Sequence, residues 1–367
     1  MRTPTGTASP PHTPTAGAEA LVALALQALG APVLRLEPMV GGGSSREFWR
    51  LTLPEGPVVG VAGTDLAETR DFLRLTTHFT ARGIPVPEVR AADGARGVYL
   101  LEDLGAHTLA DKLREWRALP DGAPLALNAL HSVVRWLAMI QVRGGQGLEA
   151  ALERTPTHLD GAAFRADIHT FLTFYAARRL PQALQPSPGV RADLDTLAQR
   201  LDALSRHHFC YRDFQTRNIM WRQRGSHASA GHSGSRGGEG PVFIDYQGGL
   251  HGPLAYDVAS LLFSPDTGAD AQERFLLVHA YLEALADQGI RLSPGAFLRE
   301  FLPVALLRRL QAMGAYVRIA EVGGKPAYLE KIPRALADLR GLLEDDGLEL
   351  GLPALQDWLG HVARQDK

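Results

Sequence analysis

The chain has 367 residues, of which 45% are hydrophobic, and a formal net charge of −2. This length can build a large core in one big domain or two lobes. The near-neutral charge argues against general nucleic-acid binding, which needs a basic face to neutralise phosphates. The sole cysteine, Cys210, excludes an intrachain disulfide and favours a cytoplasmic protein.

No stretch of the sequence approaches the roughly 20 uninterrupted apolar residues that a membrane span needs. We therefore expect neither a membrane nor a nucleic acid as partner. We expect a monomer or weak dimer.

Residues 1–17 are rich in Pro, Thr and Gly and predict a disordered tail. The Ala/Leu run that follows, Ala18 to Leu29, could be mistaken for a signal peptide, but it contains Glu19 and Gln27 and lacks a basic segment before it. It stops at Gly30, which is typical of a helix end. We predict an N-terminal amphipathic helix.

The segment from Glu37 to Leu104 has a mixed pattern. Phe48–Leu53 and Pro57–Ala62 predict a hairpin around a Pro-Glu-Gly turn. A helix should begin at Asp65, which has a glutamate three residues on, and end at Gly83. Val98–Glu102 predicts another strand.

Beyond Gly105 the pattern is mostly helical, interrupted between about Phe209 and Tyr246 by two short strand-like segments. Residues 224–240 separate these segments and are Gly/Ser-rich, which predicts a flexible insertion. The fold class is α+β, with a small β-rich N-terminal lobe (18–104) that ends in a linker strand and a larger helical C-terminal lobe (105–367). The predicted helices of this lobe are Leu127–Ile140, Phe164–Leu180, Leu194–Leu204, Ala271–Leu285, Phe297–Ile319 and Ile332–Leu343.

The stretch FCYRDFQTRNIM, residues 209–220, places polar residues between two apolar segments. Asp213 and Asn218 lie five apart in this loop, and Asp245 ends the next strand in FIDYQGG. Two carboxylates and an amide suit Mg²⁺, which takes few protein oxygens and shares its remaining positions with phosphates. A carboxylate left off the metal can accept a proton from a hydroxyl nucleophile, as in phosphoryl transfer. The alternative is a hairpin with ordinary Asp turn residues.

YRDFQTRNIM resembles the catalytic loop of aminoglycoside-phosphotransferase-like kinases, and FIDYQGGLHGPLAYDVASLL resembles their metal-binding segment and following helix. GGSSREFWRL and VYLLEDLG resemble the phosphate loop and interlobe linker of the same superfamily. The resemblance is greatest to the anomeric kinases of N-acetylmuramate and N-acetylglucosamine. It implies a two-lobed protein-kinase-like fold, a small-molecule hydroxyl acceptor as substrate, ATP as co-substrate and Mg²⁺ as cofactor.

By this resemblance Asp213 is the catalytic base, and Asn218 and Asp245 are the Mg²⁺ ligands. Asp257 organises the catalytic loop, which includes Tyr211 and Arg212. Alternatively, Asp257 is only the N-cap of its own helix. Tyr211 stands where such loops often carry His, and an aromatic side chain with a hydroxyl is a plausible substitute.

The resemblance also implies a nucleotide site in the N-terminal lobe. Backbone N–H groups and an arginine, in Gly43, Ser44, Ser45 and Arg46, would approach the phosphates; a plain glycine turn is the alternative. The backbone from Glu102 to Leu104 would take the adenine edge, with Glu102 and Asp103 otherwise only surface charges.

No lysine precedes Lys112, so the strand Val58–Ala62 cannot supply the usual phosphate-binding lysine. The anomeric sugar kinases also lack it, which favours them over antibiotic kinases. Arg46 or Arg50 would supply the missing charge. For Arg50 a strand-edge salt bridge is the alternative.

Two other functions compete with a sugar kinase. An aminoglycoside kinase needs an acidic pocket for a polycation. A pseudokinase or adaptor, which binds nucleotide without turnover, is suggested by the missing lysine, although Asp213, Asn218 and Asp245 together argue against it. The candidate acids for a polycation pocket, more typical of a solvated face, are Glu321, Asp338, Glu344, Asp345 and Asp346.

Two patterns are better explained by packing. His207, His208 and Cys210 suggest a metal cluster, but successive strand residues point to opposite faces, and Cys210 in an apolar strand should be an inert thiol. Of the tryptophans, only Trp49 is considered a candidate near the nucleotide.

Overall fold

The computed structural model describes residues 15–39, 46–152, 157–222, 239–344 and 351–364. The chain forms two compact units, each described below by itself. The N-terminal unit comprises Met1–Thr76 and Pro87–Leu104, and the C-terminal unit comprises Thr77–Val86 and Gly105–Lys367.

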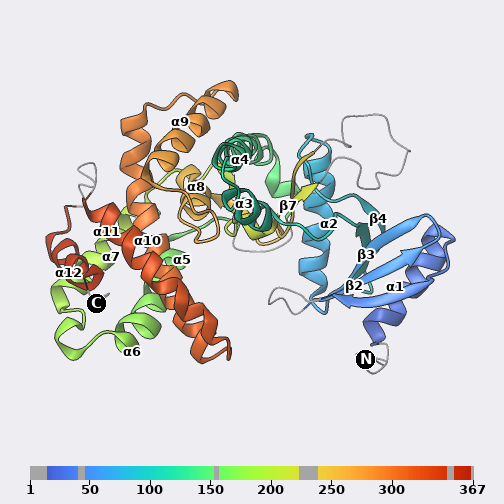
Figure 1. Cartoon of the computed structure of the whole chain (residues 1–367), viewed down its shortest axis with the longest axis horizontal. Helices are drawn as coiled ribbons and strands as arrows, with labels where there is room; N and C mark the ends of the chain where they lie inside the picture. The colour runs from blue at the N-terminus through green and yellow to red at the C-terminus, as the bar shows by residue number, and fades with distance from the viewer. Residues whose placement is uncertain (1–14, 40–45, 153–156, 223–238, 345–350, 365–367) are drawn as a thin grey trace, which may run out of the picture. The chain divides into compact units, whose positions relative to one another are not determined.

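The N-terminal unit contains one antiparallel sheet of five strands, in the order β1-β2-β3-β5-β4, with helix α1 against it (Figure 1). Helix α2 begins in this unit and ends in the other. The elements are α1 (Ala16–Leu29), β1 (Arg35–Met39), β2 (Glu47–Leu53), β3 (Gly56–Ala62), α2 (Leu66–Thr80), β4 (Val89–Asp93) and β5 (Val98–Glu102).

Helix α1 packs on the sheet because the sheet offers room for its leucines. Gly60 in β3 has no side chain, and a Cβ there would lie 2.9 Å from the nearest methyl of Leu21 on α1 and 2.7 Å from Leu51 on β2. Leu21 and Leu51 are fully buried in this core. The Thr15 hydroxyl caps the start of α1, and Gly30, with φ of 64°, ends it.

The predicted hairpin, the first helix, α2 and β5 are all confirmed. The hairpin pairs Glu47 with Ala62, and Asp65 accepts hydrogen bonds from the first N–H groups of α2. Strands β1 and β4 were not predicted. They are the edges of the sheet and show only partial burial, so neither carries the regular apolar alternation that marks a half-buried strand.

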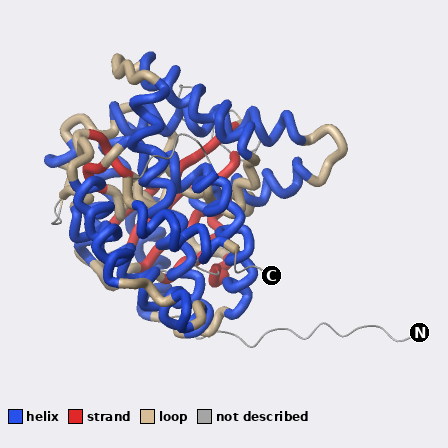
Figure 2. The backbone as a smooth tube through the Cα atoms, turned by 90° about the vertical axis from the view of Figure 1, so that its left-hand side faces the viewer, coloured by secondary structure: helices blue, strands red, loops and turns tan. Residues whose placement is uncertain are grey.

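The C-terminal unit is mostly helical (Figure 2), with two short antiparallel strand pairs. Its helices are α3 (Leu109–Arg117), α4 (Ala123–Arg143), α5 (Gly161–Thr170), a π-helical turn (Phe171–Ala176), α6 (Ala177–Arg179), α7 (Pro188–Asp202), α8 (Leu254–Leu262), α9 (Ala271–Asp287), α10 (Pro294–Glu321), α11 (Ile332–Glu344) and α12 (Pro353–Ala363). Its strands are β6 (His208–Cys210), β7 (Ile219–Arg222), β8 (Gly240–Phe243) and β9 (Leu250–Gly252). Short 3₁₀ turns lie at Leu148–Ala150, Gln182–Leu184, Thr216–Asn218 and Pro326–Lys331.

All six predicted helices of this unit are present. The one predicted over Phe164–Leu180 is broken by the π-helical turn, where α10 comes very close. Gly314 of α10 permits this approach, because a Cβ there would lie 2.5 Å from the Thr170 carbonyl oxygen and 2.7 Å from the Phe171 backbone. Helices α3 and α12 were not predicted.

The short strands of this unit form two separate pairs. The two segments that flank the polar loop, β6 and β7, do not pair with each other. Instead β6 pairs with β9, which was not predicted, and β7 pairs with β8. Three-residue strands such as β9 carry too little periodicity to be recognised from sequence.

The predicted tail and insertion lie almost entirely outside the described residues. At the tail end, α1 begins at Ala16, two residues earlier than predicted. At the insertion, the ends of β7 and β8 are paired, with Arg222 opposite Gly240.

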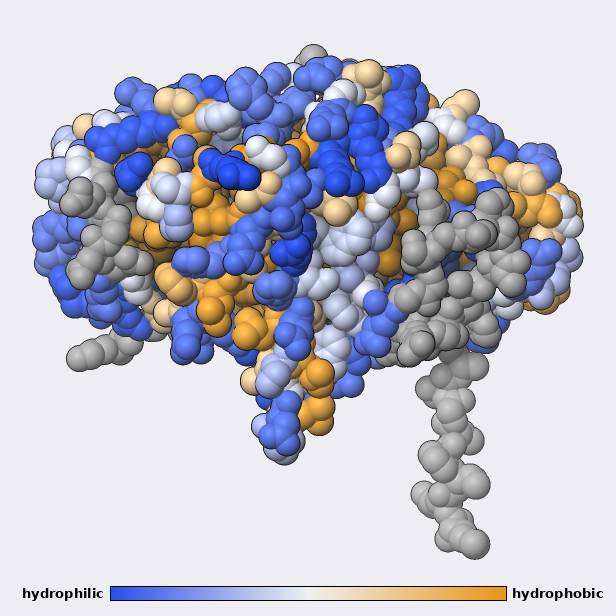
Figure 3. Space-filling view, turned by 90° about the horizontal axis from the view of Figure 1, so that it is seen from above, coloured by the Kyte–Doolittle hydropathy of each residue, from blue (hydrophilic) through white to orange (hydrophobic). Residues whose placement is uncertain are grey.

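Among the described residues, α4 is the helix long and apolar enough to cross a membrane by length and composition. A core helix of a globular protein passes the same test. Half of the apolar window of α4 is buried inside the protein, and the helix packs against α9 and α3. The visible surface in Figure 3 mixes hydrophilic and hydrophobic residues.

The close approach of α10 to the π-helical turn gives a test of packing. Gly314→Ala should destabilise the protein by about 1–3 kcal/mol, the usual effect of overpacking a filled core. Gly341→Ala, in an α11 position with no atom near a new Cβ, should instead stabilise it by about 0.5–1 kcal/mol. Urea unfolding of both variants measures this, and equal effects would contradict the packing at Gly314.

Candidate active site

The polar loop between β6 and β7 is held in a tight, partly strained conformation. Arg212 has φ of 72°, in the left-handed region that non-glycine residues rarely adopt. Asp213 follows it with an exposed side chain, and a 3₁₀ turn over Thr216–Asn218 leads into β7. The loop thus presents Asp213 to solvent from a base of buried aromatic residues.

Asn218 connects the loop to the neighbouring strand. Its side-chain N–H donates to the backbone carbonyl oxygen of Asp213 at 2.8 Å, and its backbone carbonyl accepts from the Ile244 N–H at 3.1 Å. Asn218 is buried, and the first of these bonds fixes its side-chain amide group. The next residue after Ile244 is Asp245, and the structure therefore brings Asp213, Asn218 and Asp245 together, as the sequence predicts.

Asp245 is the second strained residue, with φ of 67°. Among the described non-glycine residues, Arg212 and Asp245 alone have positive φ. Each such position costs on the order of 1–3 kcal/mol, and strain of this kind clusters at functional sites. Gln247 donates to Asp245 Oδ1 at 2.9 Å and orients its carboxylate. Sequence reasoning missed Gln247, whose only signal is an amide directly after the aspartate motif.

Tyr211 links the two segments directly. Its ring is buried, and its hydroxyl donates a short hydrogen bond to the Ile244 carbonyl oxygen. Burial is the main reason why the pKa of Tyr211 lies well above its ordinary value, so the hydroxyl keeps its proton and remains a donor. This bond explains physically how a tyrosine serves at this position.

Asp257 of α8 fixes the backbone of the loop through hydrogen bonds. Its carboxylate accepts from the Tyr211 N–H at 2.7 Å and from the Arg212 N–H at 2.9 Å. The side chain is fully buried, and burial raises its pKa to about 7 against the opposing effect of these two N–H groups. The N-cap interpretation is wrong, because Pro253 occupies the N-cap position of α8.

A second layer of buried polar residues supports Asp257. Gln141 of α4 lies 3.4 Å from its carboxylate and donates to the Leu254 carbonyl at 3.1 Å. Tyr281 of α9 donates to the Gln141 side-chain oxygen. Sequence reasoning missed both residues. The available signal was a glutamine at a core position of an apolar helix.

The residues fit a magnesium ion of the kind that phosphoryl transfer uses. Asn218 and Asp245 offer hard oxygen donors, and Mg²⁺ commonly takes one or two protein ligands with phosphates and water. Among the described residues no group of three or more His, Cys, Asp or Glu could hold a metal. Burial raises the pKa of the Cys210 thiol well above its ordinary value, as an inert thiol requires.

The predicted nucleotide residues belong to the N-terminal unit, and Gly43, Ser44 and Ser45 lie outside the described residues. Arg46 lies with its Nε 4.0 Å from Glu68 of α2 and its guanidinium 5.6 Å from the Phe48 ring centroid. Arg50 instead makes a close ion pair with Asp103, at 2.6 Å. The structure thus gives Arg50 a protein carboxylate as its partner.

The linker residues Glu102 and Asp103 make hydrogen bonds and an ion pair within the N-terminal unit. The Glu102 N–H donates to the Glu88 carbonyl at 2.9 Å, and its side chain accepts from the Glu88 N–H at 3.0 Å. Asp103 has a nearly buried side chain beside Arg50. The surface-charge alternative for Glu102 and Asp103 is therefore wrong. Trp49 is buried in the core of this unit, which gives it a packing role.

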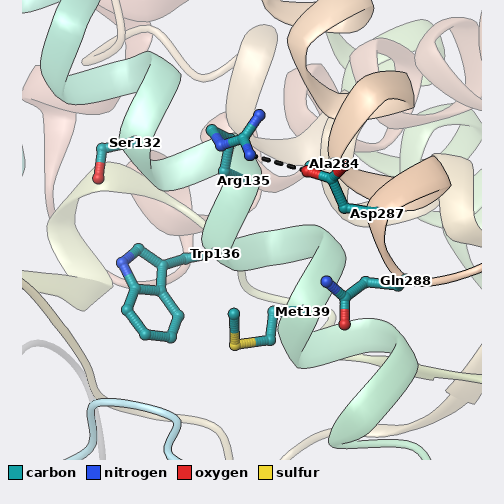
Figure 4. Close-up of a pocket in the computed structure, with 7 residues that line it drawn as sticks. All are labelled: Ser132, Arg135, Trp136, Met139, Ala284, Asp287 and Gln288. Carbon is teal, nitrogen blue, oxygen red and sulfur yellow. Dashed lines mark hydrogen bonds and ion pairs between the residues drawn. The ribbon is translucent and has the colours of Figure 1, made fainter.

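A pocket of about 220 Å³ opens between α4 and α9, away from these residues (Figure 4). Arg135 and Asp287 form an ion pair at 2.9 Å across it. The pocket is smaller than the ~300–1,000 Å³ of typical ligand sites, and it contains none of the predicted site residues. Its lining residues are Ser132, Arg135, Trp136, Met139, Ala284, Asp287 and Gln288.

Among the described residues, two of the acids proposed for a polycation pocket are paired with arginines. Asp338 is buried and lies within 4 Å of Arg274, Arg309 and Arg334. Glu321 pairs with Arg178 at 3.0 Å. Glu344 ends α11, and Asp345 and Asp346 lie outside the described residues.

Residues 35–291 match the phosphotransferase enzyme family, and the chain belongs to this family. The match includes Asp213, Asn218, Asp245 and Asp257. The protein is therefore a kinase of the phosphotransferase class, as the residues of the polar loop predicted.

The chain is similar over most of its length to two bacterial kinases of the same name. The chain is 28% identical over 315 residues to the N-acetylmuramate/N-acetylglucosamine kinase of Pseudomonas aeruginosa, covering 83% of this chain and 82% of the relative. It is 27% identical over 303 residues to the Neisseria meningitidis enzyme of the same name, covering 80% of this chain and 81% of the relative.

Solved structures share the fold. A choline/ethanolamine kinase family protein from Mesorhizobium loti aligns with a TM-score of 0.56 at 17% identity, covering 92% of this chain and 98% of that one. A GDP complex of an aminoglycoside phosphotransferase mutant aligns with a TM-score of 0.57 at 9% identity, covering 87% and 97%. These matches confirm the predicted α+β kinase-like fold.

The buried carboxylate of Asp257 predicts a pH effect on stability. Its pKa is about 7 in the folded protein, against about 3.9 in an unfolded chain. The folded state thus binds the proton more tightly, and the stabilisation is full below about pH 4 and lost as the pH rises through about 7.

Asp257→Asn removes this titration and leaves one loop N–H without an oxygen acceptor, at a cost of about 1–3 kcal/mol. The advantage of the wild type over this variant should be larger at pH 5 than at pH 8 in urea unfolding. Asp195→Asn, at an exposed carboxylate of α7, is the control and should follow the wild type. A pH-independent difference for Asp257→Asn would contradict the titration.

The two arginines of the N-terminal unit predict separable effects. Arg46→Ala should raise the KM for ATP by about 10–100-fold, the scale of a lost hydrogen bond to a charged group, if Arg46 supplies the missing lysine charge. Arg50→Ala should instead lower the thermal midpoint, because it removes the ion pair with Asp103. ATP-dependent rates and thermal melts measure both, with exposed Arg35→Ala as control. If Arg50→Ala raises the KM for ATP and Arg46→Ala lowers the thermal midpoint, Arg50 rather than Arg46 binds the phosphates.

Proposed function

We propose that this protein transfers the γ-phosphate of ATP to the anomeric hydroxyl of N-acetylmuramate or N-acetylglucosamine. The choice of acceptor rests on the similarity of the chain to two N-acetylmuramate/N-acetylglucosamine kinases over about four-fifths of its length. The observation that supports the reaction is the network joining Asp213, Asn218 and Asp245.

Asp213 is the general base in this proposal. Its exposed carboxylate receives the proton of the acceptor hydroxyl while that oxygen forms a bond to the γ-phosphorus and the bond to the β–γ bridging oxygen breaks. ADP leaves, and Asp213 then returns the proton to solvent. The anomeric hydroxyl is more acidic than other sugar hydroxyls, so a carboxylate can deprotonate it more easily.

Asn218 and Asp245 would hold Mg²⁺, which when bound neutralises charge on the nucleotide phosphates. The protein fixes both ligands before any nucleotide arrives. Asn218 is anchored to the Asp213 carbonyl, and Asp245 is oriented by Gln247. Such preorganisation means that little rearrangement is needed when the phosphates bind.

The two competing functions have weaker support. Among the described candidate acids, Asp338 and Glu321 are paired with arginines, which leaves no acidic pocket of those residues for a polycationic antibiotic. A pseudokinase would have no need for the strained backbone at Arg212 and Asp245. An ATP-dependent enzyme with one buried thiol is suited to the cytoplasm, where we place it.

The test is a panel of acceptors with Mg²⁺-ATP, read by ADP release and by phosphorus NMR. The panel holds N-acetylmuramate, N-acetylglucosamine, methyl N-acetylglucosaminide and kanamycin. Free N-acetylated sugars should be consumed, and the product should show coupling to the anomeric proton. The methyl glycoside should be inert because its anomeric oxygen is blocked.

Asp213→Asn serves as the control against contaminating kinases. Its kcat should fall by about 10²–10⁴, the usual scale for a general base. If the methyl glycoside reacts as well as the free sugar, the anomeric assignment is wrong. If kanamycin alone reacts, the protein is an antibiotic kinase.

A further inference from the structure

A second carboxylate lies beside the catalytic loop, and neither the family match nor the proposed mechanism assigns it a role. Asp167 sits on α5, and its side chain is 21% exposed, so it is neither fully buried nor freely solvated. Helix α5 packs against α10, which in turn packs against α8, the helix that carries Asp257.

Arg308 of α10 stands behind Asp167. It is nearly buried, and its guanidinium donates to the Tyr256 hydroxyl at 2.8 Å, to Ser260 Oγ at 3.1 Å and to Gln311 Oε1 at 3.2 Å. The same guanidinium lies 4.7 Å from the centroid of the Tyr256 ring. These contacts fix its position.

The contact between Arg308 and Asp167 is an ion pair rather than a short hydrogen bond. The Nη1 to Oδ2 distance is 3.8 Å, whereas charge-assisted bonds between these groups measure about 2.7–2.9 Å. A carboxylate has about four acceptor positions, so the ion pair with Arg308 leaves Asp167 acceptor capacity.

Asp167 is close enough to the catalytic loop to interact with its charges. Arg212 and Asp213 both act electrostatically on its carboxylate, and Asp213 also acts on Arg308. The contacts run continuously from the loop to Asp167. Asp257 binds the loop N–H groups, its neighbour Tyr256 binds Arg308, and Arg308 faces Asp167.

We propose that Asp167 is an acceptor-binding residue. Its carboxylate accepts a hydrogen bond from a hydroxyl or amide N–H of the sugar, while Asp213 accepts the proton of the reacting hydroxyl. This inference rests on the proposed function, since it assigns the side chain that recognises the sugar of that reaction. Arg308 and Tyr256 are its positioning residues and do not touch the acceptor.

The chemistry of Asp167 fits the acceptor of the proposed function. A carboxylate accepts hydrogen bonds, and the hydroxyl and amide groups of an N-acetylated sugar are donors that need acceptors.

Asp167→Asn tests the assignment with little change in shape. With the acceptor that reacts in the panel, its KM for that acceptor should rise about 10–100-fold, the scale of lost hydrogen bonds to a charged group. The kcat should change less than about threefold, because binding alone is weakened. The KM for ATP and the thermal midpoint should stay at the wild-type values.

Two further variants control the result. Asp167→Glu keeps the carboxylate and should recover part of the acceptor affinity that Asp167→Asn loses. Asp195→Asn removes an exposed carboxylate of α7 and should match the wild type in every parameter.

The proposal is overturned if Asp167→Asn leaves the acceptor KM unchanged. It is also overturned if this variant raises both KM values and lowers the thermal midpoint, because Asp167 is then only a counterion for Arg308. Failure of the proposed function is a separate result. If kanamycin reacts and Asp167→Asn raises its KM, the acceptor role stands while the sugar-kinase function falls.

Discussion

The fully buried carboxylate of Asp257 is the contact on which the candidate site depends. Its two oxygens accept from the consecutive N–H groups of Tyr211 and Arg212, and this pair of bonds fixes the point where the loop turns. Hydrogen bonds to a charged group each contribute about 1.5–3 kcal/mol, which is comparable with the cost of the left-handed backbone at Arg212. Burial works against the carboxylate and raises its pKa to about 7, so the site is stable only because the loop supplies donors.

The remaining site geometry follows from that anchored turn. Once Tyr211 is fixed, its hydroxyl reaches the Ile244 carbonyl, and this bond places Asp245 relative to Asp213. Asn218 closes the same ring of contacts through the Asp213 carbonyl and the Ile244 N–H. The three candidate site residues are therefore linked through backbone groups, and Gln247 orients the carboxylate of Asp245.

Buried arginines have distinct tasks in this kinase. Arg308 is held by Tyr256, Ser260 and Gln311 behind Asp167, while Arg309 lies beside Asp338 in a separate cluster. Neither is a surface charge, although arginine supplies nearly all the positive charge of the chain. Because a buried cation is stable only when paired or hydrogen-bonded, each cluster fixes the helices that contribute to it.

The sequence by itself determined the fold class, the main helices and the polar loop that holds Asp213 and Asn218, because their signals are local. Helical periodicity marked α4 and α10, and the spacing of Asp213 and Asn218 within one loop reflects the short reach of a tight turn. The sequence did not predict the edge strands β1 and β4 or the three-residue strand β9, because partial burial and short length leave no periodic pattern. Only the tertiary structure decided that β6 pairs with β9, that Asp257 binds the loop rather than capping α8, and that Asp167 pairs with Arg308. Those contacts join residues about 40 or more positions apart, and the choice of partner depends on how the helices pack, which no local pattern records.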